Sequence, residues 1–134
     1  MEIKQLQQVS AFLENRPGRL LYLLNVLAEA NINLIAHNIV DASDFGIVHL
    51  LVDRPKRALE VIRDARLTCS MTNVLEVIIP NEPGAFAEQV LKPLANAQVN
   101  IEYSYAYGVP TSNEAHIVLK VDRLERAMEA LKKG

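Results

Sequence analysis

The chain has 134 residues, of which 50% are hydrophobic and 22% are charged, and its formal net charge is −2. This composition supplies enough apolar surface for a packed core, which excludes an intrinsically disordered protein. The slight acidic balance argues against nucleic acid and anionic membrane surfaces as partners, because proteins that bind them through bulk charge are basic. The apolar runs are shorter than a membrane-spanning helix of about 20 residues, so no membrane association is expected.

The single cysteine, Cys69, cannot form an internal disulfide, and the start of the chain has no apolar secretory segment. We therefore expect a cytoplasmic protein. The three histidines, His37, His49 and His116, share no short ligand spacing, and no phosphate-binding loop of the Walker type occurs. The sequence accordingly predicts no metal site and no cofactor.

The first half of the chain is predicted to hold four strands and two helices. The predicted strands cover residues 9–14, 34–40, 45–52 and 67–72. The turn sequence Asn15-Arg16-Pro17-Gly18 ends the first strand, and leucines at helical spacing after it predict the first helix. Asp53 is the expected N-cap of the second helix, because Pro55 follows in the first turn.

The second half of the chain repeats the first. The motif Asn-x-Pro-Gly recurs at residues 81–84, and VDRPKRALEVI is matched by VDRLERAMEAL. Between this motif and the asparagine after the first helix, Asn33 or Asn100, the second copy has one more residue. The predicted strands here cover residues 74–79, 101–107 and 116–121, and the helices cover residues 85–94 and 124–131. The repeat therefore predicts two homologous domains, residues 1–72 and 73–134.

The expected fold class is α+β, with two ferredoxin-like βαββαβ units. In each unit an antiparallel sheet carries both helices on one face, because right-handed crossovers place them on the same side. The second unit lacks its last strand. Three alternatives follow for the position of this strand in the sheet. It is an open edge, it is filled by the stretch of residues 3–14, or the natural protein is longer and supplies the strand. Small units with an open edge pair readily with another chain, so we expect a homodimer.

The repeated Asn-x-Pro-Gly motif lies between a first strand and a first helix, and we call it the elbow. Asn15 or Asn81 is expected to cap the helix, and the glycine lets a ligand approach the backbone closely. N–H groups at a helix start can bind a carboxylate. The plain alternative is a capped helix entry without a ligand.

The stretch ENRPGRLLYLLNVLAEANINL resembles the start of an ACT domain, a small regulatory module that binds amino acids. DASDFGIVHLLVDRPKRALEVI resembles stand-alone proteins with two ACT domains in tandem, so that the resemblance covers about residues 5–132. It implies a non-catalytic sensor of amino-acid metabolism, with an amino acid as its ligand and a metabolic enzyme as a partner.

The resemblance also implies where the effector binds, at the interface between paired domains. It would contact the elbow, the start of the first helix and the second strand of a neighbouring domain. The ligand-binding residues implied at the two elbows are Asn15, Pro17, Gly18, Arg19 and Leu20, and Asn81, Pro83, Gly84, Ala85 and Phe86. The facing walls would be His37, Asn38 and Ile39, or Tyr103, Ser104 and Tyr105. Because Arg19 and Leu20 become Ala85 and Phe86, the two elbows need not bind the same ligand.

Three tyrosines alternate along one predicted strand, at Tyr103, Tyr105 and Tyr107, so they point to one face of the sheet. They either pack against a partner sheet or form a wall for an apolar or aromatic ligand. An RNA-binding sheet of the same topology is disfavoured, because its third-strand motif is missing. The remaining alternatives are a regulatory or scaffold subunit of a biosynthetic enzyme and a small enzyme acting on amino acids. No catalytic residue stands out for the last of these.

Overall fold

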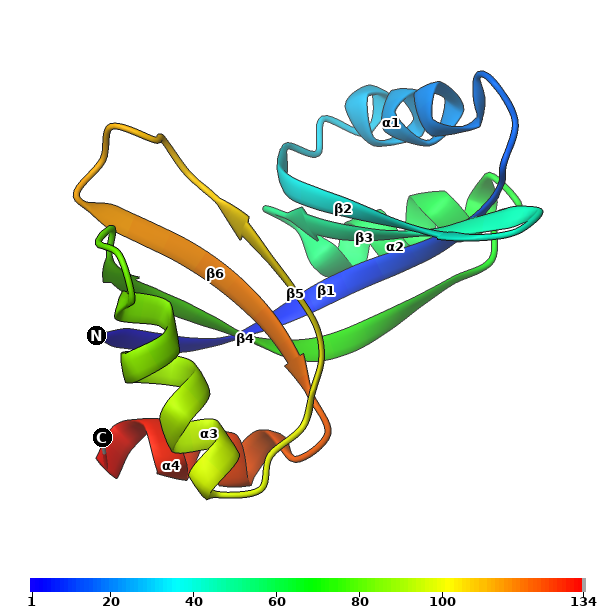
Figure 1. The fold of residues 1–134 in the computed structure, drawn as a ribbon. Coiled ribbons are helices and arrows are strands. Elements are labelled where there is room, and N and C mark those ends of the chain that lie inside the picture. Colours follow the sequence, from blue (N-terminus) through cyan, green and yellow to red (C-terminus); the bar gives the residue numbers. More distant parts are fainter. Residues whose placement is uncertain (134) are drawn as a thin grey trace. The chain divides into compact units, whose positions relative to one another are not determined.

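The computed structural model describes residues 1–133, apart from the side chain of Ala42. Its elements are β1 (Glu2–Glu14), α1 (Arg19–Glu29), β2 (Leu34–Ala42), β3 (Phe45–Val52), α2 (Pro55–Asp64), β4 (Cys69–Pro80), the π-helical segment η1 (Ala87–Leu91), α3 (Lys92–Asn96), β5 (Ile101–Tyr107), β6 (Glu114–Val121) and α4 (Leu124–Lys133) (Figure 1). They form two compact units. One is Gln7–Thr72, and the other joins Met1–Leu6 to the chain from Asn73 onward. No helix in the described part of the chain is long and apolar enough to cross a membrane.

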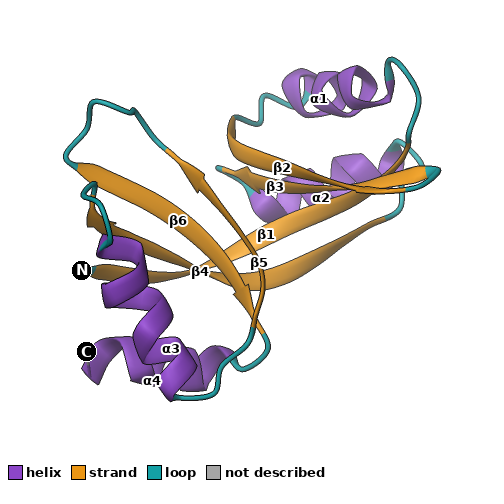
Figure 2. Ribbon diagram, viewed as in Figure 1, coloured by secondary structure: helices purple, strands orange, loops and turns teal. Residues whose placement is uncertain are grey.

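The unit of residues 7–72 has the expected βαββαβ order, with strands in the order β2-β3-β1-β4. Both β1 and β2 pair antiparallel with β3. Alternate residues of β1 (Val9, Ala11 and Leu13) pack into a core with Leu23 and Leu27 of α1 and with Ala58 and Ile62 of α2. Both helices therefore cover the same face of this sheet, as in a ferredoxin-like unit (Figure 2).

The second unit has the same architecture, and its strand order is β1-β4-β6-β5. Residues 2–6 of β1 belong to this unit and stand in the place of its fourth strand. Ile3 packs against the core that Leu75, Leu94 and Leu119 help to form. Of the alternatives for the missing strand, filling by the N-terminal stretch is therefore the one that occurs. The domain division predicted at residues 72 and 73 stays a prediction, and the compact units differ from it only in where Met1–Leu6 belongs.

The strands β1 and β4 are longer than expected because each serves both units. Residues 69–72 of β4 belong to the first unit, and its residues from Asn73 onward belong to the second. The strands predicted separately over 67–72 and 74–79 are thus one continuous strand, Cys69–Pro80.

The extra residue of the second repeat takes the form of a π turn. The N–H of Lys92 donates to the carbonyl of Ala87, five residues earlier, and so closes a wider turn than an α-helix has. Pro93, which has no N–H to donate, follows directly. The expected plain helix over residues 85–94 is therefore wrong in detail: η1 is followed by a short α3. A one-residue insertion in a helix is commonly absorbed in this way.

The predicted helix caps are wrong. The N-cap residue of α1 is Gly18, that of α2 is Arg54, and neither helix start has a side-chain cap hydrogen bond. Asp53 instead accepts a hydrogen bond from the backbone N–H of Asn33. Asp53 followed by Pro55 resembles the start of a capped helix, but the backbone N–H of Asn33 binds the carboxylate that would form the cap.

Candidate functional site

The first elbow is tied to the turn between β2 and β3. The backbone N–H of Asn15 donates to the carbonyl of Asp44 over 2.8 Å. The side-chain Nδ2 of Asn15 donates to Oδ1 of Asp41 (3.4 Å) and to the carbonyl of Ser43 (3.3 Å). Asn15 therefore holds the elbow on the hairpin and does not cap α1.

The second elbow repeats this arrangement with a longer hairpin loop. The N–H of Asn81 donates to the carbonyl of Asn113 (2.9 Å). Its Nδ2 donates to the carbonyls of Pro110 (3.2 Å) and Ser112 (3.1 Å). Here too the expectation of a capping asparagine is wrong, since the start of η1 has no side-chain cap. A shallow pocket of about 240 Å³ borders this elbow, between Asn81, Tyr107 and Glu114.

Both elbow glycines leave the helix start open. Gly18 has φ 87° and Gly84 has φ 81°, in the left-handed region that glycine adopts without strain. No heavy atom would lie within 4 Å of a Cβ added at either position. The first N–H groups of an α-helix have no intrahelical acceptor. The N–H of Arg19 donates to the carbonyl of Arg16 (3.3 Å), so the donors that α1 presents to this open space are those that follow Arg19 in the first turn. A carboxylate is the complementary ligand for such a helix start.

The predicted walls lie on the strands at the ends of the two sheets. His37, Asn38 and Ile39 are on β2, where His37 and Ile39 are exposed and lie opposite Leu50 and Val48. The residues opposite are core residues, so both side chains are on the helix-bearing face, whereas Asn38 is on the other face. The hydrogen bonds of the first elbow reach the end of β2 and the turn after it, and not these central positions.

On β5, Tyr103, Tyr105 and Tyr107 lie opposite Lys120, Val118 and His116. They share one face of the sheet, as the alternation predicts, and Ser104 is on the other face, opposite the core residue Leu119. Tyr105 is 8% exposed. The assignment of the elbow and wall residues to a ligand stays a prediction.

A family model described as an ACT domain pair matches residues 3–133. The chain belongs to this family. A search of the curated proteins finds no match. Protein BT0572 from Bacteroides thetaiotaomicron is similar in structure, with a TM-score of 0.90 and 35% identity over 98% of this chain and 89% of that chain.

The regulatory subunit of aspartate kinase from Thermus thermophilus, in its ligand-free form, also has a similar structure. Its TM-score is 0.67 and its identity is 18%, over 99% of this ACT domain pair and 96% of that chain. At this identity the likeness shows the fold alone. The suspected family and the ferredoxin-like fold class are thus confirmed.

The two elbows of the ACT domain pair differ in charge. At the first, the Arg19 Cζ lies 5.2 Å from the centroid of the Tyr22 ring, and Nε of Arg19 is buried with no hydrogen-bond partner among residues 1–133. At the second, Ala85 is 8% exposed and belongs to the core. The difference between the repeats is therefore a difference in chemistry at the start of the helix.

A buried polar cluster in the second ACT unit was missed in the sequence analysis. Glu76 is 4% exposed, and its Oε1 accepts hydrogen bonds from the hydroxyl of Tyr107 and from Nδ1 of His116, the latter over 2.9 Å. The rings of Tyr107 and His116 lie 5.0 Å apart. Burial, and then the hydrogen bond to Glu76, raises the pKa of Tyr107 above its usual range. The one signal in the sequence is a glutamate inside the apolar run VLEVII.

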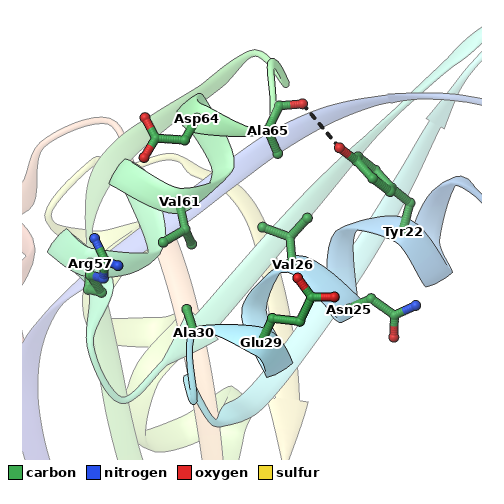
Figure 3. Close-up of a pocket in the computed structure, with 9 residues that line it drawn as sticks. All are labelled: Tyr22, Asn25, Val26, Glu29, Ala30, Arg57, Val61, Asp64 and Ala65. Atoms are coloured by element: carbon green, nitrogen blue, oxygen red, sulfur yellow. Dashed lines mark hydrogen bonds between the residues drawn. The ribbon is translucent and has the colours of Figure 1, made fainter.

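A groove of the first ACT unit lies between α1 and α2, with a volume of about 530 Å³ (Figure 3). Its apolar floor includes Val26, Ala30 and Val61, and Glu29 and Arg57 border it. The hydroxyl of Tyr22 donates to the carbonyl of Ala65 (3.3 Å) and so links the two helices at one end. This link fixes the aromatic ring over which Arg19 lies.

Proposed function

We propose that this ACT domain pair is a non-catalytic regulatory protein that binds an amino acid at its elbow. One observation carries the proposal: a left-handed glycine with open space around it begins the helix, and the motif occurs twice. The α-carboxylate of an amino acid would accept hydrogen bonds from the first N–H groups of α1. The bonds from Asn15 to the hairpin hold this backbone in place before a ligand arrives, which limits the entropy lost on binding.

The ammonium group of the ligand needs oxygen acceptors, and the proposal assigns them to the second strand of a neighbouring domain. The strands β2 and β5 are at the ends of the sheet order, so each has an outer edge on which backbone carbonyls are available. His37, Asn38 and Ile39, or Tyr103, Ser104 and Tyr105, would form this wall. A strand edge of this kind favours pairing with a second copy, which supports the proposed homodimer.

Regulation would follow from a preference of the ligand for one of two arrangements of the paired chains. A ligand shifts such an equilibrium only by its difference in affinity for the two states. A chain of this fold is the regulatory subunit of aspartate kinase in Thermus thermophilus, so a fold of this kind can act as a separate regulatory subunit. We propose a metabolic enzyme in the cytoplasm as the partner of this chain.

A thermal-shift screen against the twenty amino acids tests the proposal. A ligand that binds only the folded state raises the melting temperature by mass action, and about 10 mM of each amino acid covers affinities useful to a sensor. The screen is repeated on Gly18→Asp and on Gly18→Asn. Asparagine and aspartate both tolerate a left-handed conformation, so the pair differs chiefly by one negative charge facing the ligand carboxylate.

A shift for a small set of amino acids, lost in Gly18→Asp and largely kept in Gly18→Asn, is the expected result. The matching pair Gly84→Asp and Gly84→Asn shows whether the second elbow also binds. No shift with any amino acid, for a folded protein, would overturn the binding proposal and leave a scaffold subunit as the better interpretation. Light scattering tests the homodimer, which a monomer at micromolar concentration would contradict.

A further inference from the structure

We propose that two copies of this chain join through β2 of the first ACT unit, so that one antiparallel sheet continues from one chain into the other. The inference rests on the proposed homodimer, and it assigns the contact to one of the two outer strands. It also names the wall that a second copy adds to the proposed ligand site, since His37, Asn38 and Ile39 lie on β2. It is carried by a difference between β2 and β5 in charge and in exposed apolar side chains.

Within residues 1–133, the strand β2 has a neighbouring strand on one side only. It stands at the end of the sheet order and pairs antiparallel with β3 (Figure 1). The backbone N–H and C=O groups on its other side are therefore available to another strand. At the opposite end of the order, β5 has β6 as its neighbour. Each outer strand has a register shift near its start, so the backbone alone does not distinguish the two edges.

Large apolar side chains of β2 are exposed to water. Ile35, Ile39 and Val40 are 45%, 48% and 41% exposed. Ile39 lies opposite the core residue Val48 and is therefore on the helix-bearing face of the sheet, whereas Val40 is on the other face. Edge strands of natural proteins are usually covered or carry charge, because an uncharged apolar edge pairs readily with another chain. A strand added beside β2 would cover apolar side chains on both faces.

The matched positions of β5 carry a charged and a small residue. In the repeat, Ile35 corresponds to Glu102, and Ile39 corresponds to Ala106. The carboxylate of Glu102 lies 3.3 Å from Nζ of Lys120 on the neighbouring strand β6. A charged side chain on an edge strand discourages its pairing with another chain. The β5 edge thus has a protection that the β2 edge lacks.

The charge pattern of β2 fits a second copy of this chain as its partner. From Leu34 to Val40 the sequence is LIAHNIV, without lysine, arginine, aspartate or glutamate. In an antiparallel pair of identical strands around a two-fold axis, a charge near the axis would meet the same charge. The first acidic residue after this stretch, Asp41, accepts a hydrogen bond from Asn15 of its own chain. A different protein that recognised β2 by charge would find no complementary charge on residues 34–40.

Sedimentation velocity of the full chain, at a series of micromolar concentrations, compares two matched lysine variants. Ile39→Lys places a charge on β2, and Ala106→Lys makes the matched change on β5, both at exposed positions. We expect Ile39→Lys to raise the dissociation constant of the dimer at least about tenfold, because like charges then meet across the interface. Ala106→Lys should leave this constant unchanged. Circular dichroism shows whether both variants stay folded.

Cysteine cross-linking tests the strand pairing itself. Starting from Cys69→Ser, which removes the native thiol, each of residues 36–40 is replaced by cysteine in turn, and the chain is oxidised. Directly opposite residues of antiparallel strands have Cα atoms about 4.5–5.5 Å apart, which a disulfide can bridge. One position on β2, the one on the two-fold axis, should therefore cross-link to its own copy. Cysteines at Glu102, Ser104 and Ala106 on β5 are the matched controls and should not cross-link.

The outcomes separate this inference from the proposed homodimer. If the unmodified chain is a monomer, the homodimer itself fails and the interface fails with it. If the dimer persists in Ile39→Lys, or if Ala106→Lys dissociates it as strongly, a homodimer stands but its assignment to β2 is overturned. If no position on β2 cross-links, the continuous sheet is overturned. Dissociation in Ile39→Lys alone, together with one cross-linking position on β2, supports the inference.

Discussion

The carboxylate of Asp53 accepts a hydrogen bond of 3.0 Å from the backbone N–H of Asn33. In return, the backbone N–H of Asp53 donates to the carbonyl of Asn33 over 3.2 Å. Asp122 and Asn100 form the same two-way bridge in the second unit, with distances of 2.9 and 3.1 Å. Each bridge joins the end of one strand to the loop that enters its neighbour, and so fixes the register of the edge strand β2 or β5.

Replacing Asp53 should therefore loosen the first unit. We expect Asp53→Ala to lower the free energy of unfolding by about 1–2 kcal/mol, because a charged acceptor is lost at an exposed site. Asp53→Asn keeps an oxygen acceptor, so its loss in the free energy of unfolding should be less than half of the loss in Asp53→Ala. Urea denaturation measures both variants, and Asp122→Ala provides the equivalent change in the second unit. Equal stabilities of Asp53→Ala and the unmodified protein would show that the bridge contributes nothing.

The order of strands and helices, and the repeat itself, could be predicted because they depend on local patterns. The role of Asp53 could not, since its partner lies twenty residues earlier and only the folded chain brings them together. The same holds for Asn15, whose amide binds hairpin residues far along the chain. Around Glu2–Gln8 the sequence is mainly polar, with Ile3 and Leu6 as its apolar residues, so it gives little sign of a strand.

We expect the buried residue His49 to make the stability of the first unit sensitive to acid. It is 7% exposed, and its Nδ1 lies 2.9 Å from Oγ of Ser10. Burial lowers the pKa of His49 below its usual value of 6.5, so the folded state favours the neutral ring. The stabilisation is present above about pH 6.5 and is lost as the pH falls below it, since the unfolded state then binds the proton more readily.

The check is the free energy of unfolding, measured with urea at pH values from about 7.5 down to 5. We expect His49→Gln to be less stable than the unmodified protein at neutral pH but to show a flatter decline toward acid. His37→Gln is the matched control, because His37 is exposed on β2. A decline of the same slope in His49→Gln and the unmodified protein would assign the acid sensitivity to other groups.

Tyr107 stabilises the buried carboxylate of Glu76 by donating a hydrogen bond to it. In Tyr107→Phe the carboxylate loses this donor, and we expect a loss of about 1–3 kcal/mol in the free energy of unfolding. Tyr22→Phe removes a hydroxyl from a more exposed site and should cost less. Urea denaturation at neutral pH compares the two variants. A larger loss for Tyr22→Phe would contradict the importance assigned to the Glu76 cluster.

We also expect the ionisation of the Tyr107 hydroxyl to make the stability of the protein depend on alkaline pH. Burial and the bond to Glu76 raise the pKa of Tyr107 above its usual value of 10.0, so the folded state retains the neutral phenol. This contribution is complete below about pH 10 and is lost as the pH rises further, because the unfolded state releases its proton first. Absorbance of tyrosinate during an alkaline titration should show one late ionisation fewer in Tyr107→Phe. Unchanged late absorbance would contradict the assignment.

Ile3 tests whether the first residues of β1 complete the second unit. It packs against the core of that unit, whereas its neighbour Lys4 is exposed. We expect Ile3→Ala to lower the free energy of unfolding by about 1–2 kcal/mol, less than for a fully buried isoleucine. Lys4→Ala is the matched control and should change stability by less than about 0.5 kcal/mol, since exposed charge contributes little. Equal effects of the two substitutions, measured in urea, would mean that residues 2–6 lie beside the sheet without closing its core.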